Sequence, residues 1–206
     1  MPETSEPRPE GEQPRSIRLT DPRALRAYAH PLRMTLVGLL RSSGPFTATK
    51  AAELTGESVA NCSYHLRTLA KYGLVEEAPG GKGREKPWRA TARYTEWPGY
   101  SEDATVAEAA DALSAAAVQR YFEGVVQAIG NRHALPKEWR EAENFSDSVL
   151  YLTPEELREL GERMGELLQS YEGRESPSRR PEGARAVSVL RIAYLDRNIP
   201  DSQEEE

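Results

Sequence analysis

The sequence predicts an α+β fold in which short helices and a small β-hairpin precede a longer, helix-rich region. Apolar residues recur at helical spacing on both sides of Gly56. A glycine-rich stretch, residues 80–84, separates two short β-prone segments, as in a hairpin. Past Gly99 the composition changes to alanine-rich and acidic stretches. The order of elements before that point predicts a winged helix-turn-helix domain.

The two helices around Gly56 have clear start and stop residues. Thr47 can cap a helix over residues 48–54, Gly56 breaks the chain, and Ser58 begins a second helix that ends at Gly73. The predicted inward stripe of the second helix is Val59, Cys62, Leu66 and Leu69. We expect this stripe to pack on the rest of the domain.

The outward side of the second helix carries short, hydrogen-bonding and cationic side chains, a composition that suits the major groove of DNA. We expect Asn61 and Tyr64 to contact base edges, and Arg67 and Lys71 to contact phosphates. His65 is either a further phosphate contact or a half-buried histidine. The predicted DNA-binding residues are Ser58, Ala60, Asn61, Ser63, Tyr64, His65, Arg67, Lys71, Lys82, Arg84 and Lys86.

The segments that flank these helices complete the predicted domain. Asp21 and Pro22 open a short helix, and a leucine stripe over residues 32–40 would pack beneath the helix-turn-helix. Leu74-Val75 and residues 88–94 are the predicted strands of the wing. The predicted divisions are a disordered segment 1–19, a DNA-binding domain 20–98, a C-terminal region 99–200 and an acidic tail 201–206.

The C-terminal region is predicted to be helical with a small sheet. A long helix over residues 105–129 places alanines and larger apolar residues on one face. Thr153 to Glu156 form a capping box that opens a helix reaching Tyr171, and residues 145–152 and 186–195 are predicted strands that could pair. We expect dimerisation through Leu113, Ala117, Tyr121 and Val125 of the long helix.

Charge is segregated along the chain. Residues 1–20 carry 3 basic and 4 acidic side chains, residues 21–99 carry 12 and 7, and residues 100–206 carry 12 and 22. The three net charges of −1, +5 and −10 sum to the overall −6. Because the positive section coincides with the predicted helix-turn-helix, charge and motif together favour DNA as the partner.

Three stretches of the sequence resemble one known family. The stretches HPLRMTLVGLL, AAELTGESVANCSYHLRTLAKYGLV and GGKGREKPWRAT, within residues 21–95, resemble the arsenical-resistance-regulator (ArsR) family of bacterial winged-helix transcription factors. The resemblance implies homodimers that repress promoters and release them when an effector binds. Metal-sensing members carry paired cysteines in the helix before the recognition helix, where this chain has residues 50–54, KAAEL.

Several other classes of function are disfavoured. The sequence contains no nucleophile elbow, phosphate-binding loop, HExxH motif or dinucleotide fingerprint, so we do not expect an enzyme or a cofactor. Cys62 and His65 lie one helical turn apart, but two ligands are too few for zinc, and we predict no metal site. A single cysteine and the lack of a membrane span or signal peptide favour the cytoplasm.

The sequence thus predicts a homodimeric repressor of the ArsR-like group that binds an inverted-repeat operator in double-stranded DNA. The alternative is a winged helix used only for protein contacts. The aromatic residues of the C-terminal region would either build a dimer core or line a pocket for a small organic effector. They are Tyr121, Phe122, Trp139, Phe145, Tyr151, Tyr171 and Tyr194.

Overall fold

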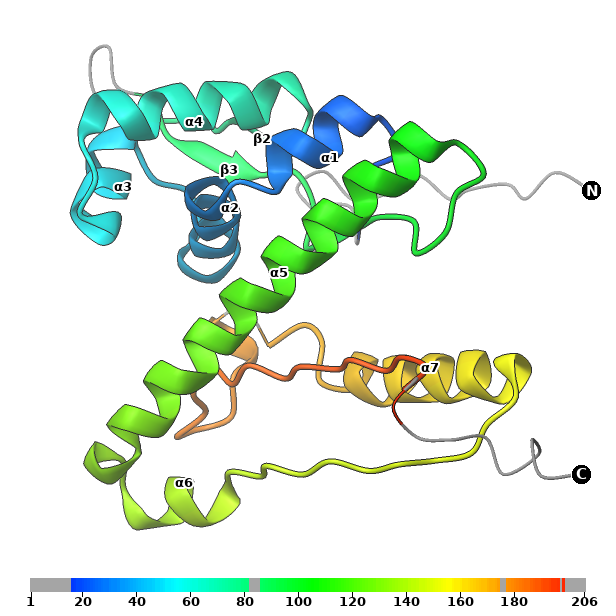
Figure 1. The fold of residues 1–206 in the computed structure, drawn as a ribbon. Coiled ribbons are helices and arrows are strands. Elements are labelled where there is room, and N and C mark those ends of the chain that lie inside the picture. The colour runs from blue at the N-terminus through cyan, green and yellow to red at the C-terminus, as the bar shows by residue number, and fades with distance from the viewer. Residues whose placement is uncertain (1–15, 82–85, 175–176, 197, 199–206) are drawn as a thin grey trace, which may run out of the picture. The chain divides into compact units, whose positions relative to one another are not determined.

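A computed structural model describes residues 16–81, 86–174, 177–196 and 198 of the chain. The chain divides into two compact units, Met1–Asn131 and Arg132–Glu206. The first unit contains β1 (Ser16–Arg18), α1 (Pro22–Tyr28), α2 (Pro31–Ser43), α3 (Ala48–Thr55), α4 (Val59–Lys71), β2 (Val75–Glu77), β3 (Trp88–Ala90), β4 (Tyr94–Glu96) and α5 (Ala104–Asn131) (Figure 1). The second contains the 3-10 helix η1 (Arg132–Ala134), α6 (Lys137–Ala142), α7 (Pro154–Gln169) and the 3-10 helix η2 (Pro177–Arg179).

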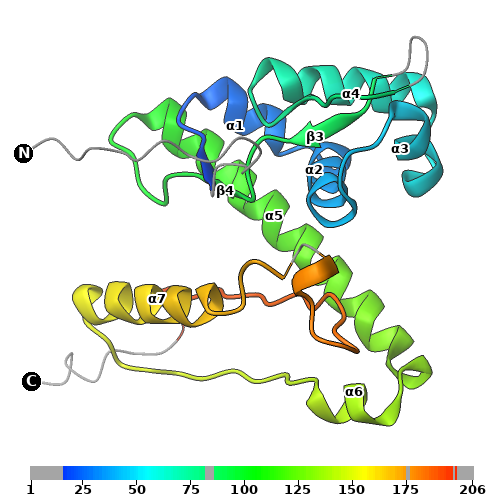
Figure 2. The ribbon, with the colours of Figure 1, turned by 180° about the vertical axis from the view of Figure 1, so that it is seen from behind.

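Helices α3 and α4 form the predicted helix-turn-helix, seen from two sides in Figures 1 and 2. The Thr47 side chain accepts a hydrogen bond from the backbone N–H of Lys50, which caps α3. Gly56 then takes a left-handed conformation with φ of 74°, where a side chain would be strained. The Ser58 hydroxyl accepts from the Asn61 N–H at 3.1 Å and starts α4. Local chemistry therefore sets both helix starts.

The core of the first unit draws side chains from α1, α2, α4, α5 and the strand β2. Its largest fully buried residues include Leu25, Leu36, Leu66, Leu69, Leu74 and Leu113. The predicted inward stripe of α4 is confirmed at Cys62, Leu66 and Leu69. It is wrong at Val59, which is 47% exposed because α4 begins at this residue, at the edge of the core.

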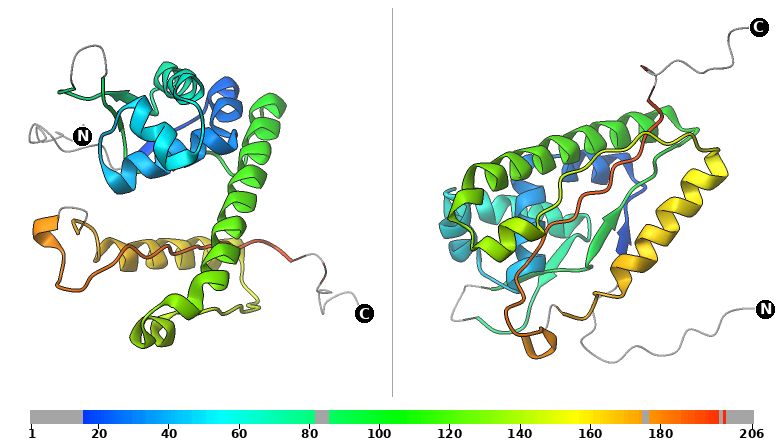
Figure 3. Two further views of the ribbon diagram at one scale, coloured as in Figure 1. Left: turned by 90° about the vertical axis from the view of Figure 1, so that its left-hand side faces the viewer. Right: turned by 90° about the horizontal axis from the view of Figure 1, so that it is seen from below.

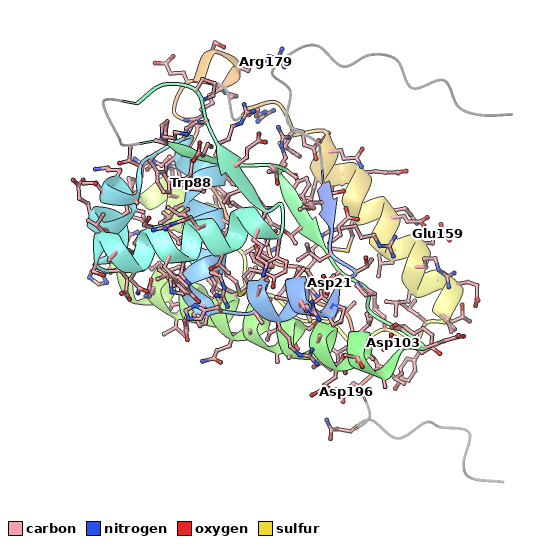
Figure 4. All side chains as sticks on the ribbon, turned by 90° about the horizontal axis from the view of Figure 1, so that it is seen from above. Asp21, Trp88, Asp103, Glu159, Arg179 and Asp196 are labelled. Atoms are coloured by element: carbon pink, nitrogen blue, oxygen red, sulfur yellow. The ribbon has the colours of Figure 1, made fainter. Side chains whose placement is uncertain are left out.

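Among the described residues, the first unit has two sheets of two strands each. The wing strands β2 and β3 pair antiparallel, with Val75 opposite Ala90, as predicted for the hairpin. The expected second wing strand over residues 88–94 is interrupted, and its last residue, Tyr94, belongs instead to β4. Strand β4 lies beside β1 (Figure 4) and pairs with it in parallel. In this pairing Tyr94 lies opposite Ser16.

The pairing of β1 corrects the expectation that residues 1–19 are disordered. Leu19 is 4% exposed, and its N–H donates to the carbonyl of Glu96 at 2.8 Å. Composition alone suggested a polar tail, but Ile17 and Leu19 supply apolar surface to the core. The expectation for residues 1–15 lies outside the described residues.

Helix α5 is a single long helix whose N-terminal half packs on the core and whose C-terminal half projects beyond the other helices of its unit (Figure 3). Asp103 caps it by accepting from the N–H of Thr105 at 2.8 Å. The indole N–H of Trp97 donates to Ser114 on α5 at 2.9 Å, which fixes the preceding loop to the helix. These contacts make the first half of α5 part of the winged domain.

Two of the four predicted dimerisation residues are therefore internal. Leu113 is 0% and Ala117 is 2% exposed, because both lie in the core of their own unit. A stripe with a spacing of four residues rotates by roughly 40° at each step around a helix with 3.6 residues per turn. The predicted face therefore turns from the core into solvent along α5. Tyr121 is 36% exposed and Val125 is half-buried.

In the second unit, the capping box of α7 is confirmed. Thr153 accepts from the Glu156 N–H at 3.2 Å, and the Glu156 carboxylate accepts from the Thr153 N–H at 2.8 Å. Residues 145–152 and 186–195, which were expected to pair, form no strand in the part of this unit that the structure describes. Their apolar sequences favour strands, but no neighbouring strand within the unit supplies the hydrogen bonds.

The burial of Leu113 yields a first prediction. Leu113→Ala should lower the free energy of unfolding by about 2–4 kcal/mol, because it removes buried methyl groups and leaves a cavity in the core. Asp111→Ala, at an exposed residue on the same helix, should change it by less than about 0.5 kcal/mol. Urea unfolding of the full chain, followed by tryptophan fluorescence, measures both. Equal effects would contradict the internal role of Leu113.

Candidate nucleic-acid interface

The exposed side of α4 carries most of the residues predicted to contact DNA. Ala60, Arg67 and Lys71 are exposed, and Tyr64 is 60% exposed. Asn61 and Ser63 are half-buried beside them. Since Cys62, Leu66 and Leu69 fill the opposite side of the helix, this surface is fixed by the core. We call it the α4 face.

Local hydrogen bonds hold the polar side chains of the α4 face close to the helix. Arg67 donates from Nη2 to the Ser63 hydroxyl at 2.9 Å and from Nε to the Ser63 carbonyl at 3.2 Å. The Asn61 amide donates to Glu57 at 2.8 Å. The face therefore presents side-chain donors and acceptors that can bond to another molecule without any change in the fold of the helix.

Two cations in the described part of the wing each have a carboxylate partner. Lys86 pairs with Glu77, and Arg89 of β3 pairs with Glu76 of β2 at 2.7 Å. All four side chains are between 36% and 63% exposed, so these are surface ion pairs. Lys82 and Arg84, the other two predicted wing contacts, lie outside the described residues.

A groove of about 420 Å³ lies where α3, α4 and the wing meet. It is lined by Thr47, Ala48, Thr49, Val59, Ser63, Arg67, Glu77, Lys86 and Trp88. Trp88 belongs to β3 (Figure 4), and its backbone pairs with that of Phe46 in a short bridge. The start of α3 thus faces the same groove as Arg67 and Lys86.

Sequence reasoning missed the start of α3 and Arg89 as parts of this surface. Thr47 was recognised as a helix cap, but not as part of the groove beside α4 and the wing. Arg89 could have been found from the alternation of the wing strand, because its neighbours Trp88 and Ala90 contribute to the core.

His65 is not on the α4 face. It is 6% exposed, and its ring lies 4.5 Å from the ring of His30, measured between centroids. Its Nδ1 atom is buried and has no hydrogen-bond partner among the described residues. The interpretation as a phosphate contact is therefore wrong, and the alternative of a largely buried histidine holds. On α4, His65 lies beside the buried stripe that contains Leu66, so its ring faces the core.

The two histidines form a pair that favours the neutral state. Burial lowers the pKa of His65 most, and His30 and Arg33 lower it further, while Glu57 opposes the shift. The pKa of His30 is lowered first by burial and then by Arg33, and Glu57 again raises it. His30 Nδ1 also caps α2 by accepting from the Leu32 N–H at 3.2 Å, which requires that nitrogen to be unprotonated.

Comparison with known protein families agrees with this geometry. Residues 28–78 match a family model described as a helix-turn-helix domain. The matched span begins at the end of α1, runs through α2, α3 and α4, and ends just after β2. No curated protein matches the chain. A helix-turn-helix domain with an exposed polar second helix indicates a DNA-binding regulator.

The described residues contain neither a cluster of metal ligands nor a helix that could cross a membrane. In residues 16–81, 86–174, 177–196 and 198, no three His, Cys, Asp or Glu side chains come together as a metal site. The Cys62 thiol is fully buried, 3.6 Å from the Thr55 hydroxyl. Within the same residues, no helix is both long enough and apolar enough to cross a membrane.

The histidine pair yields a second prediction. Because the pKa of each ring is lower in the folded state, the unfolded chain binds more protons, and stability should fall as the pH drops below about 6.5. Each histidine can contribute a slope of at most about 1.4 kcal/mol per pH unit. His30→Asn, which keeps a capping side chain, combined with His65→Phe should flatten this dependence.

Urea unfolding at a series of pH values between about 7 and 5 measures this slope. The matched control is His133→Asn in the second unit, where the side chain is exposed. It should leave the slope of the full chain unchanged. If the double variant kept the slope of the unmodified protein, the histidine pair would not be its source.

Proposed function

We propose that the protein is a homodimeric transcriptional repressor of the ArsR-like group, with α4 as the recognition helix. It inserts the α4 face into the major groove of an operator, and the wing contacts the flanking backbone. The observation that carries the proposal is the division of α4 into a core side and a polar, cationic outer side. The match to a helix-turn-helix domain supports the same conclusion.

The roles of the side chains follow from their chemistry. The Asn61 amide offers both a donor and an acceptor, which suits the edge of an adenine, and the exposed Tyr64 adds a hydroxyl and an aromatic ring. Arg67 and Lys71 are cations on the same face, and phosphates are their natural partners. Ser58, Ala60 and Ser63 are small enough to allow the helix to approach the DNA closely.

The ion pairs of the wing do not oppose this function. Exposed ion pairs contribute about 0–1 kcal/mol, so Lys86 and Arg89 can exchange Glu77 and Glu76 for phosphates at small cost. In the groove, the cations Arg67 and Lys86 both line the space beside the start of α3, a placement that suits a phosphate. We infer that a backbone phosphate binds there.

The homodimer is the proposed functional state because helix-turn-helix proteins read two half-sites about one turn of DNA apart. Leu113 and Ala117 hold α5 to its own unit, which leaves the projecting half of α5 for contact between copies. Phe122, Val126 and Ile129 are each more than half exposed there, at a spacing of four and three residues. Tyr121 and Val125 flank this stripe.

Repression would be relieved by a small organic effector that binds the two dimer states with different affinity. The aromatic side chains of the C-terminal region support an organic molecule rather than a metal ion. We place this regulator in the cytoplasm and assign it no enzymatic activity. These assignments follow from the proposed role and the motifs of the sequence.

The third prediction concerns salt. Binding of duplex DNA should weaken steeply with salt, because each phosphate contact adds about 0.9 to the slope of log affinity against log salt concentration. Arg67→Ala with Lys71→Ala should lower this slope by roughly 1.8 for each bound copy, or roughly 3.6 for the dimer, since two contacts are lost per copy. Fluorescence anisotropy of a labelled duplex, titrated at several salt concentrations, gives the slope.

The matched control removes two exposed cations elsewhere. Lys137→Ala with Arg140→Ala on α6 produces the same change in net charge as the α4 variant. It should leave the slope unchanged, because α6 is assigned no contact with DNA. Equal slopes for the two double variants would show that the α4 face does not bind phosphates.

A further inference from the structure

The second unit exposes an apolar surface that its own elements do not cover. Every described side chain of residues 132–196 and 198 whose burial is determined is at least partly exposed. The contacts within the unit are peripheral, such as the 2.6 Å ion pair between Arg132 and Glu143 and the stacking of Arg185 on Trp139. Without buried apolar side chains, a unit of this size cannot offset the entropy cost of folding.

Helix α7 is nevertheless built as a packing helix. Its capping box fixes its start, and its apolar residues lie on one face, at Leu157, Leu160, Met164, Leu167 and Leu168. Leu167 is 65% exposed, and Leu157 and Met164 are 37% and 42% exposed. An apolar stripe of this length indicates that another surface covers it.

Residues 186–195 add a second apolar surface. Leu190, Ile192 and Tyr194 occupy alternate positions, and Val187 and Val189 alternate on the other side of the same extended chain. All five are at least 40% exposed. A segment with apolar residues at both sets of alternate positions has the sequence pattern of a strand in the interior of a sheet, although these residues form no strand within the described unit.

The charges of this unit are complementary to each other. Helix α7 carries five glutamates and two arginines, a net charge of −3, on residues 154–169. Residues 174–191 carry five arginines and two glutamates, a net charge of +3. A two-fold interface places each surface of one copy against a surface of the other. The unit therefore has the charge pattern that self-association needs.

We propose that the second unit is a self-association module, in which α7 and residues 186–195 of one copy are covered by the same elements of a second copy. Fifteen large hydrophobic side chains are exposed between Phe145 and Leu195. This apolar set suits a stable interface, which takes roughly 20–30 residues from each partner. The inference rests on the proposed function only for the two-fold symmetry of the assembly.

Sedimentation of the full chain tests this module through a pair of matched double variants. Leu160→Gln with Leu167→Gln removes two apolar side chains from the α7 stripe and keeps good helix formers. It should raise the dissociation constant of the dimer by at least about 100-fold. The control, Lys137→Gln with Arg140→Gln on α6, introduces the same side chain twice at exposed positions outside the proposed interface. It should change the constant by less than about tenfold.

Two outcomes would overturn the inference: a monomeric unmodified protein at tens of micromolar, or a Leu160/Leu167 variant that dimerises as tightly as the control. A dimer that is broken only by Phe122→Gln with Val126→Gln would assign the whole interface to α5 and would also overturn it.

Binding of duplex DNA by each variant separates this inference from the proposed function. A monomeric Leu160/Leu167 variant that still binds duplex DNA, with about half the salt slope of the dimer, supports the module, whereas loss of DNA binding by an intact dimer would count against the repressor alone.

Discussion

Burial of the inner stripe of α4 is the constraint on which the rest of the interface depends. Cys62, Leu66 and Leu69 are fully buried among side chains of α1, α2 and β2, so the rotation of α4 about its own axis is fixed. A fully buried leucine contributes roughly 1.5–3 kcal/mol, which far exceeds any single contact on the outer side. The core therefore decides which residues face solvent, and the α4 face is a consequence of packing.

The electrostatics of the domain follow from local placement and not from the net charge of the chain. An overall charge of −6 would repel DNA if it were evenly spread, but residues 21–99 carry a net charge of +5. Within this section, Lys86 and Arg89 are held by carboxylates of the neighbouring strand. Such exposed ion pairs orient the long cationic side chains. Because each pair is weak, the cation can leave its carboxylate and bind a phosphate at small cost. A buried pair would be far harder to exchange.

The features that could be predicted from the sequence are those that depend on residues close together in the chain. The caps at Thr47, Ser58 and Thr153 and the break at Gly56 were predicted because each acts within three or four residues. The parallel pairing of β1 with β4 was missed, because it joins residues almost eighty positions apart and composition carries no information about it. The prediction that Leu113 lies in a dimer interface was wrong for a geometric reason. Residues spaced by four along α5 rotate around the helix, so the predicted residues do not all face the same neighbouring surface.

Selection of binding sites from a random-sequence library of duplex DNA by the full chain tests the central claim most directly. We expect enrichment of two inverted half-sites with centres about one helical turn, roughly 34 Å, apart. The variant Tyr64→Ala with Asn61→Ala should lose this preference and still bind DNA, because the phosphate contacts remain. Failure to enrich any sequence, or enrichment of the same sequence by the variant, would contradict the assignment of α4 as the recognition helix.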